Sequence, residues 1–132
     1  MNRHNTHIMA IKVKTKVCPS SIHGNGLFAD RDINQGELIW EFGFCDSRIP
    51  ITEATLEQKH FGYVNNANPS WLVICGDESR FMNFSDSPNC GFNGLESANQ
   101  EAPLFAKRAI LEGEELTVGV ETDADSARKL SL

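Results

Sequence analysis

The apolar and polar positions of this chain alternate in short runs, and the pattern predicts strands more often than helices. In residues 10–17, isoleucine, valine and threonine alternate with lysine, which is typical of a half-buried strand with one solvated face. Those lysines need no acidic partner, because an ordinary polar face explains them. Residues 71–75 are apolar throughout and predict a buried strand. Further strands are predicted at 38–42, 102–107 and 115–118.

Turn signals separate these runs. Residues 24–26 (Gly-Asn-Gly) predict a tight turn into a short strand that ends at Ala29. Residues 32–37 and 111–114 predict two more turns, and residues 65–70 predict a loop. The chain is therefore expected to change direction every few residues.

One segment has the features of a helix. Residues 52–63 begin with Thr52 and Glu53 and carry Leu56 and His60 four positions apart. We expect a helix there, with Tyr63, the only tyrosine of the chain, on the helix or just after it.

The length of 132 residues corresponds to one domain. Many short strands with turns at roughly even spacing predict a compact, mostly β domain of the α+β class over residues 10–120. Residues 1–9 are polar and rich in histidine, and we expect them to be either a disordered start or a non-native addition before Met9. Residues 121–132 are predicted to form a polar, weakly helical tail.

The net charge of −6 argues against nucleic acid as a direct partner, because phosphate binding requires clustered lysine and arginine. The charge suits a basic peptide, although a charge of this size also serves simply to keep a small protein soluble. The longest clear apolar run has five residues, at 71–75, against the roughly 20 that span a bilayer. Because residues 1–9 hold no apolar signal segment, no membrane is expected and the predicted location is cytoplasmic.

The four cysteines, Cys18, Cys45, Cys75 and Cys90, lie at least 15 positions apart. Structural zinc sites use ligand pairs at short spacing, so no metal site is predicted. Free and mostly buried thiols are expected instead.

Three segments carry residues that a plain strand or helix does not require. Residues 23–29 (HGNGLFA) contain two glycines that let a backbone approach a ligand closely, although a structural turn explains them as well. Residues 80–89 (RFMNFSDSPN) combine aromatic residues with two asparagines, two serines and a proline. Their polar groups need either a ligand or local turn hydrogen bonds. The third segment is residues 106–117 (AKRAILEGEELT).

Together these segments resemble the SET domain family, in particular small stand-alone bacterial and viral SET proteins of the protein-lysine methyltransferase type. The family pattern reads HGxGLFA, IxxGExI, RFxNHSxxPN and AxRxIxxGEELT. This chain matches it in order at 23–29, 33–39, 80–89 and 106–117, across roughly residues 11–120. Four ordered matches are far more specific than any one of them.

The resemblance implies a β-clip-like fold of small curved sheets whose C-terminal segment threads beneath a loop as a pseudoknot. It also implies that S-adenosylmethionine binds on one face, while the substrate lysine of a basic protein or peptide enters through a narrow channel from the other. Asn83 would hold the methionine moiety, and the backbone at Phe84 would read the adenine edge. The residues that the resemblance assigns to the cofactor are Gly24, Asn25, Gly26, Arg80, Asn83 and Phe84.

The implied reaction is an in-line attack of a neutral lysine nitrogen on a sulfonium methyl group. Free lysine has a pKa of about 10.4, so the site must favour the neutral amine. The sulfonium charge and an apolar channel both act in that direction, and the protein contributes mainly alignment.

The sequence departs from the family pattern at three places. Phe84 stands where the family has histidine, and Val120 stands where it has a tyrosine whose hydroxyl lines the methyl-transfer pore. Losing one preorganised polar group costs about 10²-fold or more in rate. No aromatic residue follows Phe105 to cover an adenine. Tyr63 is the candidate catalytic hydroxyl, and its alternative role is amphipathic packing.

Three hypotheses follow. The first is an S-adenosylmethionine-dependent protein-lysine methyltransferase. The second is a catalytically impaired SET module that binds cofactor or peptide without turnover, as Phe84 and Val120 indicate. The third is a structural or dimerisation domain, a possible homodimer in which Trp40, Trp71 and Phe92 furnish an interface, although each also suits core packing.

Overall fold

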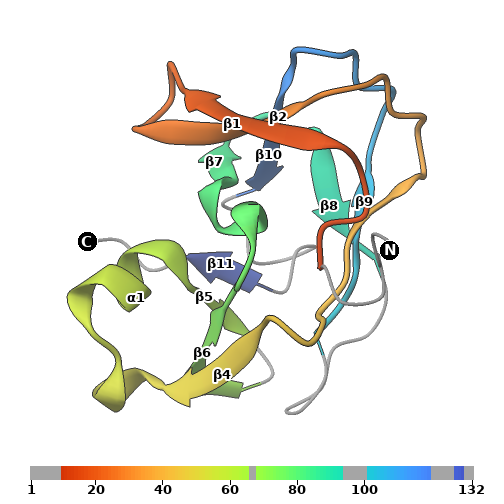
Figure 1. The fold of residues 1–132 in the computed structure, drawn as a ribbon. Helices are drawn as coiled ribbons and strands as arrows, with labels where there is room; N and C mark the ends of the chain where they lie inside the picture. Colours follow the sequence, from red (N-terminus) through yellow and green to blue (C-terminus); the bar gives the residue numbers. More distant parts are fainter. Residues whose placement is uncertain (1–9, 66–67, 94–100, 120–126, 130–132) are drawn as a thin grey trace, which may run out of the picture.

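The computed structural model describes residues 10–65, 68–93, 101–119 and 127–129, which form two β-sheets and one short α-helix (Figure 1). This confirms the predicted mostly β architecture. The larger sheet contains β1 (Thr15–Pro19), β2 (Asn25–Ala29), β3 (Leu38–Trp40), β7 (Asn83–Ser85), β8 (Cys90–Phe92), β9 (Leu104–Ala106) and β10 (Glu115–Gly119). The smaller sheet contains β4 (Ser47–Pro50), β5 (Tyr63–Asn65), β6 (Asn68–Ile74) and β11 (Ala127–Lys129). The helical elements are α1 (Leu56–Phe61) and two 3₁₀ turns, η1 (Ile51–Glu53) and η2 (Glu78–Phe81).

Strand β10 joins segments that are far apart in the sequence. In the larger sheet the strand order is β1-β2-β10-β8-β9-β3, and β7 also pairs with β10. Leu116 pairs with Leu27 of β2 in antiparallel register, while Val118 pairs with Phe84 of β7 and with Cys90 of β8 in parallel register. The three segments with unusual polar residues therefore meet around one strand. The threading of the C-terminal segment beneath a loop stays a prediction.

Most of the core lies along the larger sheet, and β6 of the smaller sheet contributes Leu72 and Val73. Its largest fully buried side chains each contribute about 1.5–3 kcal/mol relative to an exposed position. A reciprocal pair of backbone hydrogen bonds joins Ile33 and Ile110, at 2.7 and 2.9 Å, and closes the core between two turns. The fully buried set comprises Leu27, Ile33, Ile39, Leu72, Val73, Cys90, Ile110 and Leu116.

The alternating segment at residues 10–17 pairs first with β3 and then with β2. Ile11 forms an isolated bridge with Trp40, and the amide of Lys12 donates to the carbonyl of Ile39 at 2.8 Å. The chain then crosses over to pair with β2 as β1, which runs from Thr15 to Pro19. The prediction of one strand over 10–17 was therefore wrong in its bounds, because a period-2 pattern does not reveal a change of partner.

The helix is shorter than predicted. Its N-cap is Thr55, which forms a capping box with Gln58, so the helix begins at Leu56, four residues later than the predicted start at Thr52. The helix ends at Gly62, where a Cβ would lie 2.7 Å from Leu72 and 2.9 Å from two carbonyl oxygens. The chain continues directly into β5, which places Tyr63 on a strand.

Two further predictions were wrong: the loop expected at 65–70 and the weakly helical tail expected at 121–132 both contribute strands. Strands β5 and β6 form a hairpin with Asn65 opposite Asn68, so most of the expected loop at 65–70 belongs to the sheet. Residues 127–129 pair with β5 as β11 and are not helical. Strand pairing across such a distance leaves no local signal in a polar segment. The predicted disorder of 1–9 and the rest of the tail lie outside the described residues.

Candidate functional site

Glycine is required at Gly24, in the turn before β2, and at Gly26, within β2, for two different structural reasons. Gly24 has φ +46°, in the left-handed region that favours glycine, and a Cβ there would meet no atom within 4 Å. The carbonyl of Gly24 accepts a hydrogen bond from the amide of Ser20 at 2.8 Å, which closes the turn. At Gly26 a Cβ would lie 2.2 Å from Oε2 of Glu115. The first glycine therefore leaves open space above the turn, and the second makes room for a carboxylate.

The side chain of Asn83, on β7, holds the glycine turn in place through hydrogen bonds. Its Nδ2 lies 3.0 Å from the carbonyl oxygen of His23 and 3.2 Å from that of Asn25. The same atom lies 2.9 Å from Oε2 of Glu115 and 3.2 Å from Oγ of Ser20. The structure thus brings together the predicted residues of the glycine turn and Asn83. Their contact with a cofactor stays a prediction.

Asn89, the second asparagine of the same segment, is satisfied within the protein. It is 2% exposed, its Nδ2 donates to the carbonyl of Glu115 at 2.8 Å, and its Oδ1 accepts from the amide of Thr117 at 2.9 Å. The bonds of Asn89 are therefore neither contacts with a ligand nor the local turn hydrogen bonds expected as the alternative, because its partners lie 26 and 28 positions away on β10. Asn83 faces the glycine turn.

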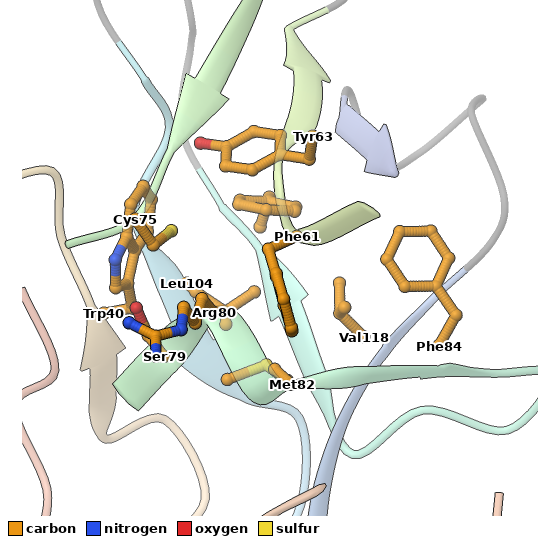
Figure 2. A pocket seen from close by; sticks show the side chains of 11 residues that line it. Trp40, Phe61, Tyr63, Cys75, Ser79, Arg80, Met82, Phe84, Leu104 and Val118 are labelled. Carbon is orange, nitrogen blue, oxygen red and sulfur yellow. The ribbon is translucent and has the colours of Figure 1, made fainter. Parts of the chain in front are cut away.

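A cavity partly open to solvent lies between residues of the two sheets, and the empty space in and in front of it is about 460 Å³ (Figure 2). Ring and aliphatic side chains form most of its wall. Arg80 and Phe84 line it as predicted site residues, whereas the glycine turn and Asn83 lie outside its wall. The lining residues are Trp40, Phe61, Tyr63, Cys75, Ser79, Arg80, Met82, Phe84, Phe92, Leu104 and Val118.

Aromatic contacts hold two groups of rings in this wall. The rings of Trp40 and Tyr63 meet edge to face with centroids 6.0 Å apart, and Tyr63 lies 6.1 Å from Phe92. The guanidinium of Arg80 lies 5.7 Å from the ring centroid of Phe61 and 4.7 Å from that of Phe81. Such contacts are worth about 0.5–1.5 kcal/mol each beyond area burial. They keep the rings in fixed positions around the cavity.

Tyr63, the candidate catalytic residue, lies in the wall of the cavity and is 8% exposed. Its hydroxyl donates to Oε1 of Glu101 at 3.1 Å. The Nε of Arg48 donates to the other oxygen of that carboxylate at 2.8 Å, and the Glu101 side chain is 1% exposed. Burial, and next the charge of Glu101, raise the pKa of Tyr63 well above its usual value. The phenol therefore keeps its proton and directs it to Glu101.

Sequence reasoning missed several residues of the wall. Trp40 and Phe92 were considered only for packing or an interface, and Phe61 was not considered, because an isolated aromatic residue carries no motif. Glu101, which is outside the wall but accepts the hydrogen bond of Tyr63, was missed for the same reason. Trp40 Nε1 is the only buried side-chain nitrogen or oxygen within the described residues that lacks a hydrogen-bond partner. The site therefore contains a buried donor that the protein itself does not satisfy.

The cysteines are all free, as predicted, but only Cys90 is buried, and the other three are half-buried. Burial raises the pKa of Cys90 to about 12, and Cys75 lines the cavity. Among the described residues, no three His, Cys, Asp or Glu side chains are placed to hold a metal ion. In the same part of the chain, no helix is long and apolar enough to cross a bilayer.

Comparison with protein families matches the SET domain model to residues 24–119. The chain is 30% identical over 124 residues to the H3 lysine-36 specific histone-lysine N-methyltransferase of Candida albicans, covering 87% of this chain and 15% of that protein. It is 36% identical over 106 residues to human histone-lysine N-methyltransferase 2B, covering 74% of this chain and 4% of that protein. The chain thus spans a small part of the length of these relatives.

Solved structures show the same fold. KRYPTONITE, solved with mCHH DNA, an H3(1-15) peptide and SAH, superposes with a TM-score of 0.64 at 19% identity, over 83% of this chain and 23% of that one. A candidate histone methyltransferase from Plasmodium falciparum superposes with a TM-score of 0.61 at 19% identity, over 84% of this chain and 96% of that one. Both likenesses support the two-sheet architecture.

Proposed function

This chain belongs to the SET domain family, and from that premise we propose that it transfers a methyl group from S-adenosylmethionine to the ε-amine of a lysine. One observation carries the proposal. Asn83 joins the glycine turn to Glu115, while the next residue, Phe84, lines an apolar cavity. Such a reaction needs one site for the cofactor and one for the lysine. We assign the cofactor to the turn held by Asn83 and the lysine to the apolar cavity beside it.

The residues around Asn83 fit an adenosyl cofactor. The backbone of 24–26 faces open space at Gly24, and the exposed guanidinium of Arg80 offers donors suited to a carboxylate. The half-buried ring of Phe84 offers an apolar contact. The bound cofactor would supply a methyl group on a cationic sulfonium. Because the amide hydrogens of Asn83 already point at the turn and Glu115, we assign Asn83 the role of holding the turn in shape.

The cavity walls fit the lysine side chain. Aliphatic groups such as Leu104 and Val118 offer no hydrogen-bond acceptor to an unmodified ammonium, so burying its charged N–H donors is costly. They therefore lower the pKa of a lysine amine from about 10.4 and favour the neutral nucleophile. The walls also exclude water and hold the amine in one direction, which is the alignment that displacement at a methyl group requires.

The substrate class that fits is a basic protein segment. The chain carries a net charge of −6, which attracts lysine-rich peptides and raises their association rate. The names of the relatives refer to histone lysines, including lysine 36 of H3. We therefore propose a histone-like tail as the substrate.

The test is methyl transfer from radiolabelled S-adenosylmethionine to a lysine-containing H3 peptide, with an all-arginine version of the peptide as the negative substrate. We expect label only on the lysine peptide. Asn83→Ala should lower transfer by about tenfold or more, the equivalent of losing one to two hydrogen bonds. Asn93→Ala, at an exposed asparagine, should leave it unchanged. Absence of label on any basic protein would overturn the proposal.

A second candidate is a module that binds cofactor and peptide without turnover. The hydroxyl of Tyr63, the only tyrosine of the chain, is already bonded to Glu101, and Val120, which lies outside the described residues, occupies the position of the family tyrosine. Calorimetry with S-adenosylhomocysteine separates the cases. Binding without transfer, together with transfer gained in Val120→Tyr, would favour this candidate over the first.

A further inference from the structure

We propose that the cavity is an aromatic cage that binds a methylated lysine side chain more tightly than an unmodified one. The proposal rests on the proposed function in one respect, since it uses the same cavity for lysine. It goes further by naming the state of the side chain that the walls prefer, which is a di- or trimethylated ammonium.

The first argument is the chemistry of the walls. Five aromatic side chains from five separate elements line the space (Figure 2). The faces of such rings carry negative potential and attract cations within about 6 Å, and quaternary ammonium groups are recognised in this way. A trimethylated ammonium keeps its charge, loses less hydration on burial and offers methyl groups to the rings. The five are Trp40, Phe61, Tyr63, Phe84 and Phe92.

The second argument is the shortage of hydrogen-bond acceptors. An unmodified ammonium brings three N–H donors, and no carboxylate side chain lines the cavity. Oγ of Ser79 donates to Asp77 at 2.5 Å and the hydroxyl of Tyr63 donates to Glu101, so what these two lining side chains can still offer an ammonium is a neutral hydroxyl oxygen each. Trp40 Nε1 is itself a donor. Three buried N–H donors exceed the two neutral hydroxyl oxygens, and no carboxylate among the lining side chains neutralises their charge, so each methyl group removes a donor that is costly to bury.

Arg80 is the one cation among the lining side chains, and its position is compatible with a cationic ligand. The residue is exposed, and its guanidinium lies over the rings of Phe61 and Phe81. Its charge is therefore hydrated and screened. The rings of Trp40, Tyr63 and Phe92 line the cavity from other strands, and they form the part of the wall that we assign to the methylammonium.

The test uses tryptophan fluorescence of the whole chain without an adenosyl ligand. The chain has two tryptophans, and Trp71 lies outside the cavity lining and is 37% exposed. Trp71→Phe therefore leaves Trp40 as the single reporter in the wall. Peptides with one unmodified, mono-, di- or trimethylated lysine should bind with rising affinity, reaching about tenfold or more between the two ends of the series. Equal affinity across the series, or tighter binding of unmodified lysine, overturns the proposal.

Two further measurements separate a cage from a merely apolar hole. A peptide carrying the neutral tert-butyl analogue of trimethyl-lysine should bind about fivefold or more weakly than the trimethylated peptide, because only the charge differs. Equal binding of the two overturns the proposal without any variant. Phe92→Leu should reduce the methyl preference, while the volume-conserving Leu104→Met should keep it. A preference unchanged in a folded Phe92→Leu protein also overturns the proposal.

The outcome is distinguishable from that of the proposed function. Transfer to lysine with no binding preference for methylated side chains sinks the cage and leaves the methyltransferase. A methyl preference in a chain that never transfers label supports the cage and sinks the methyltransferase.

Discussion

The side-chain amide of Asn83 lies 2.9 Å from Oε2 of Glu115, and this pair connects two segments separated by 32 residues. Oγ of Ser20 donates to the same carboxylate at 2.8 and 2.9 Å. The carboxylate fits there only because Gly26 has no side chain, since a Cβ would approach it to 2.2 Å. One glycine, one asparagine and one glutamate from three motifs therefore form a single unit beneath the turn.

Gly26→Ala should break this unit. The new methyl group would displace the Glu115 carboxylate from Asn83 and Ser20, at a cost of about 1–3 kcal/mol in the free energy of unfolding. The affinity for S-adenosylhomocysteine should fall at the same time. Urea unfolding and calorimetry measure the two effects. In a Glu115→Ala background the same change should cost clearly less, because the clash is gone. Additive costs in this double-mutant cycle would contradict the coupling.

Gly24→Ala tests the open side of the turn. A residue with a Cβ at φ +46° is strained by about 1 kcal/mol, and the methyl group would project into the empty space above the turn. We expect a modest loss of stability and a loss of cofactor affinity of about tenfold. Gly113→Ala is the matched control, because Gly113 also has positive φ and open surroundings but lies in another turn. An equal loss of cofactor affinity in both variants would argue against a ligand above Gly24.

The sequence revealed the motifs of this fold better than their contacts. The pattern RFMNFSDSPN indicated buried polar groups, but it did not separate Asn83, which holds the glycine turn, from Asn89, which bonds to Glu115 and Thr117. That distinction depends on whether each asparagine meets a side chain or the backbone of β10, and so on long-range pairing. In the same way, Phe61 and Trp40 have no local signal, because a cavity exists only once both sheets are assembled.

Tyr63→Phe should separate packing from chemistry at the candidate hydroxyl. The ring contacts with Trp40 and Phe92 remain, while the hydrogen bond to Glu101 is lost, so the free energy of unfolding should fall by about 1–3 kcal/mol. If the hydroxyl acts in transfer, kcat should fall by about 10²-fold with little change in KM. An unchanged kcat in a folded protein would assign Tyr63 to packing alone.

Arg48→Met should destabilise the protein through the buried carboxylate of Glu101. That side chain is 1% exposed, and removing its guanidinium partner leaves a buried charge poorly compensated, at a cost of about 3–5 kcal/mol. Arg48 also lies over the ring of Phe42 at 4.3 Å, so packing is lost as well. Arg31→Met is the control, because the Arg31–Glu37 pair is 41% and 31% exposed and should cost at most about 1 kcal/mol. Equal costs in thermal or urea unfolding would contradict the assignment.

The stability of the protein should fall at alkaline pH, and Cys90 should account for a defined part of that fall. Burial raises the pKa of Cys90 from 9.0 to about 12, so between these values the unfolded chain releases a proton that the folded protein retains. The folded state binds more protons in this window, and the free energy of unfolding therefore decreases as pH rises, by about 1.4 kcal/mol per pH unit for one group. Below pH 9 this contribution is fully present.

Cys90→Ala removes that contribution together with some packing. The quantity to compare is therefore the change in the free energy of unfolding per pH unit, and not its absolute value. Urea unfolding between pH 8 and 10.5 should give a shallower alkaline slope for Cys90→Ala than for the unchanged chain. Tyr63, whose pKa is also raised by burial, adds to the slope above about pH 10 in both proteins and cancels in the difference. Parallel curves for the chain and Cys90→Ala would show that the thiol at β8 loses its proton as readily in the folded state as in the unfolded one.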